Sequence, residues 1–246
     1  MNKHLLSTSA IALGVAMAAP AAAQQWDMDW GGYYYTSVGA VNVDGDAGTV
    51  AGPGTDFDGV DVFTDGELFF SPSVTLDNGM TFGLTVEMEA LNDEGGTDGI
   101  DESYVTISSD TLGRIIIGSE NSAGYKLTVA APQVGSMTIN SSFINGFVPV
   151  TGGFGYRQAG FSSYAEVAGN NDVQRITYFT PSFNGLTVGV SYAASGNNNA
   201  QNNYFNVGSP NGGLDRNVGV SDIFDIGLNY SQSFNGVDIN FGARWG

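Results

Sequence analysis

The chain has 246 residues, with 7 Lys and Arg against 25 Asp and Glu, one histidine and no cysteine. The acidic balance excludes nucleic-acid binding, because a protein that binds phosphates needs a basic surface. Since the histidine lies at position 4, inside the leader described next, the rest of the chain offers no Ser-His or Cys-His catalysis and no usual zinc site. We therefore expect no enzyme.

Residues 1–23 are predicted to be a secretory signal peptide. A short positive start at Lys3 and His4 precedes an apolar stretch from Leu5 to Ala19, and small residues at 21–23 form a cleavage site. The apolar stretch is too short and too interrupted for a transmembrane helix, and no other run approaches about 18 apolar residues. We expect an exported domain over 24–246, with a formal charge of 6 − 25 = −19 after the loss of Lys3.

Alternation of apolar and polar residues predicts nine antiparallel strands in this domain. They are expected, in chain order, at 30–43, 65–76, 81–91, 101–109, 114–118, 173–180, 186–194, 222–232 and 237–245. The clearest is 81–91, TFGLTVEMEAL, whose apolar residues fall on one face and whose Glu87 and Glu89 fall on the other. Glutamates on such a face fit a strand with lipid on one side and water on the other.

Short and long connections alternate between these strands. Short turns are expected at 77–79, 110–113, 182–185 and 234–236, and long connections at 44–61, 92–100, 119–172 and 195–221. Because consecutive antiparallel strands reverse direction, all short turns should lie on one side of the sheet and all long loops on the other. Outer-membrane β-barrels have this arrangement.

Several stretches resemble Gram-negative general porins. Segment 101–126, DESYVTISSDTLGRIIIGSENSAGYK, is similar to the strand–turn–strand unit that leads into the porin constriction loop, and 174–193, QRITYFTPSFNGLTVGVSYA, resembles the strand pair that follows it. The start GGYYYTSVGAV and the signal are similar to those of alphaproteobacterial porins. The resemblance implies an all-β fold, an antiparallel transmembrane β-barrel of about 16 strands, usually a homotrimer, in the outer membrane of a Gram-negative bacterium.

The number of strands departs from that pattern. About nine are visible, whereas a closed single-chain barrel of bacteria has an even number. The chain also ends on Trp245-Gly246 and not on the terminal aromatic residue usual in the family. We expect an N-terminal fragment of a longer porin, with an open sheet whose strands 30–43 and 237–245 do not pair. A complete ten-stranded barrel is the alternative, if 127–172 contains a further strand.

The few basic residues indicate where a pore would be lined. Outward-facing apolar neighbours predict that Arg114, Arg175 and Arg244 face the interior. The resemblance implies a constriction where such wall residues face charges of an inward-folded third loop; the charges expected in or beside that loop are Glu120, Glu166, Asp172, Arg157 and Lys126. An interpretation of equal weight is that Arg114 and Arg175 pair with loop acids to hold the loop on the wall.

Acidic residues allow two further hypotheses. Those with interior parity, Glu67, Glu87, Glu89 and Glu102, would give a negative potential that favours cations, although solubility or a halophilic habitat explains the acidity equally well. Two loop groups offer oxygen ligands for calcium, namely Asp93, Glu94, Asp98 and Asp101, and Asp44 with Asp46. Their spacing does not match an EF-hand loop, so solvated acidic loops are the favoured interpretation and no cofactor is expected.

These features predict a porin: a water-filled channel for passive diffusion of small hydrophilic solutes and ions, in contact with outer-membrane lipid and preferring cations. A substrate-selective channel is equally compatible with the sequence. The alternative from another class is a secreted Gly/Asn-rich β-protein that acts as an adhesin or carbohydrate-binding module.

Overall fold

The structure is a computed structural model that describes residues 25–44, 56–90, 99–130, 172–196 and 220–246. The strands in these ranges are β1 (Trp30–Asp44), β2 (Asp56–Phe70), β3 (Ser73–Thr75), β4 (Thr81–Glu89), β5 (Ile100–Ser109), β6 (Gly113–Glu120), β7 (Val173–Phe179), β8 (Leu186–Ser195), β9 (Ser221–Phe234) and β10 (Val237–Trp245). A short helix, α2 (Ala123–Lys126), follows β6. Within the described ranges, no helix is long and apolar enough to cross a membrane.

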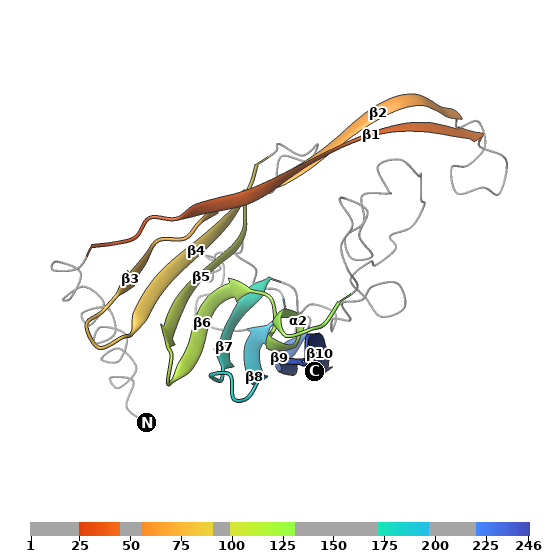
Figure 1. Cartoon of the computed structure of the whole chain (residues 1–246). Coiled ribbons are helices and arrows are strands. Elements are labelled where there is room, and N and C mark those ends of the chain that lie inside the picture. The colour runs from red at the N-terminus through yellow and green to blue at the C-terminus, as the bar shows by residue number, and fades with distance from the viewer. Residues whose placement is uncertain (1–24, 45–55, 91–98, 131–171, 197–219) are drawn as a thin grey trace.

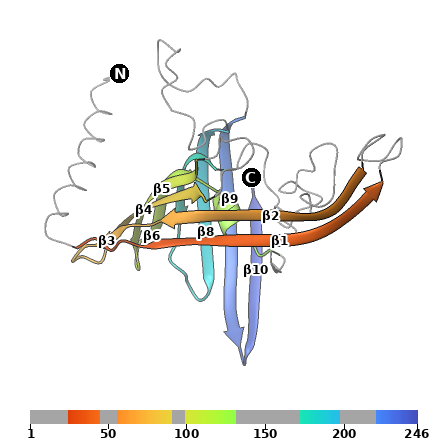
Figure 2. The same cartoon turned by 90° about the horizontal axis from the view of Figure 1, so that it is seen from above.

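All ten strands belong to one antiparallel sheet. Its order, β1-β2-β4-β5-β6-β7-β8-β9-β10 with β3 beside β4, follows the chain, so each strand pairs with a sequence neighbour. The sheet curves, and α2 lies on its concave side (Figure 1). It also twists, because β1 and β2 run across the direction of β9 and β10 when seen from above (Figure 2). In the described part of the chain β1 and β10 form the two edges, and the sheet is not closed.

Short turns join neighbouring strands on one side of the sheet. Between β9 and β10, Asn235 and Gly236 have φ values of 50° and 81°, and Asn184 and Gly185 before β8 have 49° and 86°. Two consecutive positive φ values are the requirement of a type I′ hairpin turn, which Asn-Gly meets at low cost. The expected turns at 182–185 and 234–236 are therefore confirmed.

The second predicted strand was wrong in both its start and its end. The Gly/Asp-rich composition of 44–61 predicted a loop, yet β2 begins at Asp56 and pairs with β1 over its whole length. A strand forms there because apolar residues also alternate with polar ones in this stretch. Val60 and Val62 lie opposite Ala40 and Val38 on one face of the hairpin. The resulting hairpin extends well past the other strands (Figure 1).

The same segment breaks after Phe70. Pro72 has no N–H to donate, and the chain there turns to pair with the N-terminal segment instead, since Ser73 N donates to Asp27 O at 2.9 Å and Asp27 N to Ser73 O at 2.8 Å. β3 is consequently a separate strand beside β4. This break explains why the described sheet has ten strands where about nine were expected.

The two faces of the sheet differ in chemistry as predicted. We call the face against which α2 packs the inner face, and the other the outer face. The outer face exposes large apolar side chains across the sheet, among them Leu84, Ile115, Ile117, Ile176, Val190, Phe224, Ile226, Phe241 and Trp245. A continuous apolar surface of this width in contact with water would be strongly unfavourable, so this face requires an apolar environment such as lipid.

Candidate functional site

A segment that follows β6 folds onto the inner face. Ser122 caps α2, because its Oγ accepts a hydrogen bond from Tyr125 N at 3.2 Å. Ala123 is fully buried against Ile116 of β6 and Phe179 of β7. This small apolar cluster places the first turn of the segment on the sheet.

Glycines on three adjacent strands make room for this segment. A Cβ on Gly227 of β9 would lie 2.6 Å from the carbonyl oxygen of Ala123, and a Cβ on Gly242 of β10 would lie 2.9 Å from the nitrogen of Val129. On β8, a Cβ at Gly189 would lie 3.1 Å from the Cβ of Ala123. These distances leave no space for a larger residue, so the glycines let the backbone of 123–129 approach the wall.

Polar contacts fix the segment to the same strands. The buried carboxylate of Asp225 on β9 accepts hydrogen bonds from the Gly124 N–H and, at 2.9 Å, from Nη2 of Arg244 on β10. Ser191 Oγ on β8 accepts from Ala123 N at 3.2 Å. Charge-assisted bonds in a buried setting are the stronger ones, so Asp225 is the central anchor.

These contacts confirm part of the expectation that the long connection 119–172 folds inward. Residues 121–130 lie on the inner face, and Asn229 Nδ2 on β9 adds a hydrogen bond to Leu127 O at 3.2 Å. Residues 131–171 lie outside the described ranges, and with them the predicted site residues Arg157 and Glu166.

A second group of contacts ties the start of the segment to β5 and β6. The carboxylate of Glu120, fully buried, pairs with Lys126 Nζ at 2.7 Å. Asn121 donates from its backbone N to Glu120 Oε1 at 2.8 Å and from Nδ2 to Glu102. Lys126 also lies 5.6 Å from the centre of the Tyr104 ring. The structure therefore pairs Glu120 with a lysine of the segment, whereas the sequence suggested a wall arginine.

The three wall arginines all lie on the inner face, in different surroundings. Arg244 is held by Asp225, a partner that sequence reasoning missed. Arg175 is buried in β7, opposite Gly118 and near the β7 start where the buried Asp172 lies. Arg114 lies at the other end of β6, beside the short turns, with its guanidinium 4.7 Å from the centre of the Phe179 ring.

Acidic side chains line the inner face of β2, β4 and β5. Glu67 lies opposite Glu89 in the ladder, and the carboxylate oxygens of Glu67, Glu89 and Asp101 are within 4.8 Å of one another. Tyr33 OH donates to Glu67 at 2.7 Å. Acidic groups gather in this way without an ion, so we assign no metal here; Asp93, Glu94, Asp98 and Asp46 lie outside the described residues.

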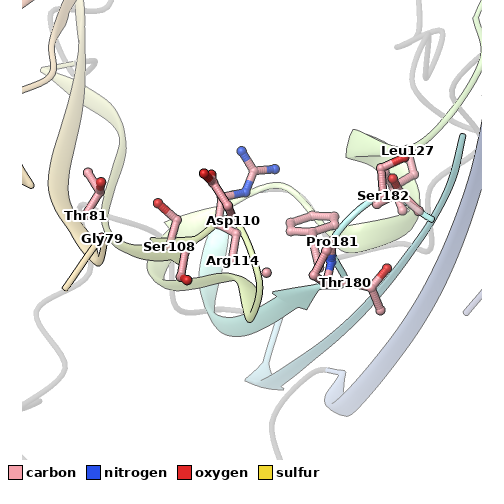
Figure 3. Close-up of a pocket in the computed structure, with 13 residues that line it drawn as sticks. Gly79, Thr81, Ser108, Asp110, Arg114, Leu127, Thr180, Pro181 and Ser182 are labelled. Atoms are coloured by element: carbon pink, nitrogen blue, oxygen red, sulfur yellow. The ribbon is translucent and has the colours of Figure 1, made fainter. Parts of the chain in front are cut away.

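A pocket of about 380 Å³ opens at the short-turn end of the inner face (Figure 3). Its walls come from β4 to β8 and from the inward segment, and include Thr81, Ser108, Asp110, Arg114, Leu127 and Phe179. One feature of the sequence pointed to this pocket: serine and threonine residues recur near the short turns at strand positions that face the interior. Without the pairing of the strands, that signal does not reveal which hydroxyls converge.

Comparison with protein families identifies the family to which the chain is similar. The family model described as Gram-negative porin matches residues 7–246, which include every described strand and the inward segment. No match to a curated protein is found.

Proposed function

Because this chain belongs to the Gram-negative porin family and is therefore a channel protein of the outer membrane, we propose that its inner face lines a water-filled pore. Small hydrophilic solutes and ions would cross this pore by passive diffusion, with a preference for cations. The driving force is the gradient of the solute, and no chemical step is part of the proposal.

The observation that carries the proposal is the division of the sheet into two faces. Every large side chain on the outer face of β6, Ile115 and Ile117, is exposed and apolar, while Arg114 and Glu120 of the same strand lie on the inner face. A strand with this division satisfies its backbone within the sheet and its outer side chains in lipid. Its inner charges are satisfied by water, as at the exposed Arg114, or by an ion pair, as at the buried Glu120.

The inward segment supports a narrow zone in this pore. Residues 121–130 cover part of the inner face and bring charges with them, through the Glu120–Lys126 pair. We propose that Arg175, Arg244, Glu120 and Asp172 border this zone together with Arg157 and Glu166, and that Arg114 lines the pore at its short-turn end. We further propose a homotrimer, as is usual in the family.

The acidic inner wall predicts cation preference. Its carboxylates raise the local concentration of cations relative to anions. Replacing Glu67→Gln and Glu89→Gln together should therefore move the channel toward equal passage of both ions. The reversal potential across a planar bilayer under a KCl gradient measures this change, and it should shrink at 1 M salt, where the Debye length is about 3 Å.

Asp27→Asn with Asp29→Asn is the matched control, because it removes two charges from exposed positions in the N-terminal segment. This control should retain the selectivity of the wild type. An anion-selective wild type, or an equal effect of both double substitutions, would contradict the role of the inner-wall acids. Absence of stepwise conductance in bilayers would contradict the channel itself.

A further inference from the structure

Two opposite charges line the pocket at the short-turn end without pairing. Arg114 and Ser108 are direct partners in the ladder between β6 and β5, and Asp110 follows Ser108 by two residues. Figure 3 shows Asp110 and Arg114 on the same wall of the pocket. Among the described residues, Arg114 forms no ion pair, neither with Asp110 nor with another acid.

The guanidinium is held in place by a neutral group. It lies over the Phe179 ring, 4.7 Å from the ring centre. Stacking of this kind positions a guanidinium through its flat face and leaves its N–H edges able to take a carboxylate. Arg114 is therefore oriented but not neutralised.

The rest of the pocket is partly apolar. Phe179, Pro181 and Leu127 line one part of it, and the hydroxyls of Ser108 and Thr187 line another. Leu127 belongs to the inward segment, and its backbone carbonyl accepts a hydrogen bond from Asn229 Nδ2. The pocket thus offers a positive group, a negative group, an apolar surface and hydroxyls within one small space.

We propose that this pocket is a binding subsite for small zwitterionic solutes, namely α-amino acids with a short apolar side chain. The carboxylate binds Arg114, the ammonium group binds Asp110, and the side chain contacts Phe179 and Leu127. A simple anion would be attracted by Arg114 and repelled by Asp110, and a simple cation the reverse, whereas a zwitterion satisfies both. The subsite rests on the proposed function in one respect: if the inner face lines a pore, the pocket lies at the short-turn mouth of that pore.

Binding of L-alanine compared with lactamide tests the subsite. Lactamide is uncharged and similar in size, so it retains the shape of alanine without its two charges. Titrations followed by saturation-transfer NMR, on the protein purified from outer membranes, should show tighter binding of alanine. Because exposed ion pairs contribute little, Arg114→Gln and Asp110→Asn should each weaken alanine binding by about two- to fivefold and leave lactamide unaffected.

Asp238→Asn is the matched control, because Asp238 is an exposed acid at the same end of the sheet and does not line the pocket. It should bind alanine as the wild type does. Asp110 lies in an exposed turn, so its substitution tests the subsite even if Arg114→Gln fails to fold. Equal binding of alanine and lactamide, or unchanged alanine binding in Asp110→Asn, would overturn the proposal. KCl conductance, measured for the wild type and for the same variants, reports on the channel separately. Absence of conductance in the wild type would contradict the proposed function and not the subsite.

Discussion

A lysine introduced by Val105→Lys is expected to keep the protein from inserting stably into the outer membrane, whereas Thr106→Lys is expected to be tolerated. Both positions lie in the middle of β5. Val105 is paired with Leu84 and Ile117 on the outer face, and Thr106 is paired with Gly83 and Ile116 on the inner face. A lysine on the lipid side near the middle of the membrane costs about 2–4 kcal/mol, whereas a lysine on the water side avoids this cost.

The measurement is the amount of protein recovered in the outer-membrane fraction, together with heat-modifiable mobility on gels as a sign of the folded sheet. Thr106→Lys serves as the matched control, since it adds the same charge to the neighbouring residue. Gly83 opposite it has no side chain to obstruct the lysine. Equal recovery of both variants would show that the two faces of β5 do not meet lipid and water as described.

Asp225→Ala should release the inward segment from the wall. It removes the acceptor of the Gly124 N–H and leaves Arg244 without its carboxylate. Loss of one partner of a buried ion pair costs about 3–5 kcal/mol. This exceeds the contribution of the two neutral hydrogen bonds that would still hold the segment on β8 and β9, from Ala123 N to Ser191 and from Asn229 to Leu127 O. We expect a larger and noisier single-channel conductance, because a detached segment no longer holds a fixed position in the pore.

Labelling of a thiol gives an independent measure of the same release. The chain has no cysteine, so Ala123→Cys introduces a unique thiol at a fully buried position. A water-soluble maleimide should label it slowly in the otherwise unchanged protein and faster when Asp225→Ala is added. Asp238→Ala, at an exposed position of β10, is the control and should leave both conductance and labelling unchanged. Slow labelling in both backgrounds would refute the anchoring role of Asp225.

The strands were predictable because their signal is local. A side-chain period of two residues, together with Asn-Gly turns, was enough to assign Ile115 and Ile117 to one face and Arg114 to the other. The structure confirms those assignments. The start of β2 was not predictable in the same way, because Asp58, Gly59 and Asp61 have low strand propensity and only pairing with β1 holds them extended.

The site was less predictable because its contacts join distant parts of the chain. Nothing near Asp225 in the sequence indicates that it accepts from Gly124, 101 residues away. The glycines at 189, 227 and 242 could be recognised as strand glycines, but their role appears only when the segment lies over them. The alternation of side chains along each strand was enough to place the charged wall residues on the inner face. It did not determine which residues they contact.

The neighbouring positions of β6 and β7 have a consequence for the order of folding. Ser119 Oγ donates to Asp172 O although 53 residues separate them, whereas the other neighbouring strands are joined by shorter connections. Closing a long loop costs more entropy and delays the contacts it brings, so the hairpins of β1–β6 and of β7–β10 should form first. The segment after β6 docks on β8–β10, and this contact closes the same long connection. The pairing of β6 with β7 then requires no further closure of a long loop. The anchor at Asp225 is thus expected to accelerate the joining of the two halves, in addition to holding the segment once the sheet is complete.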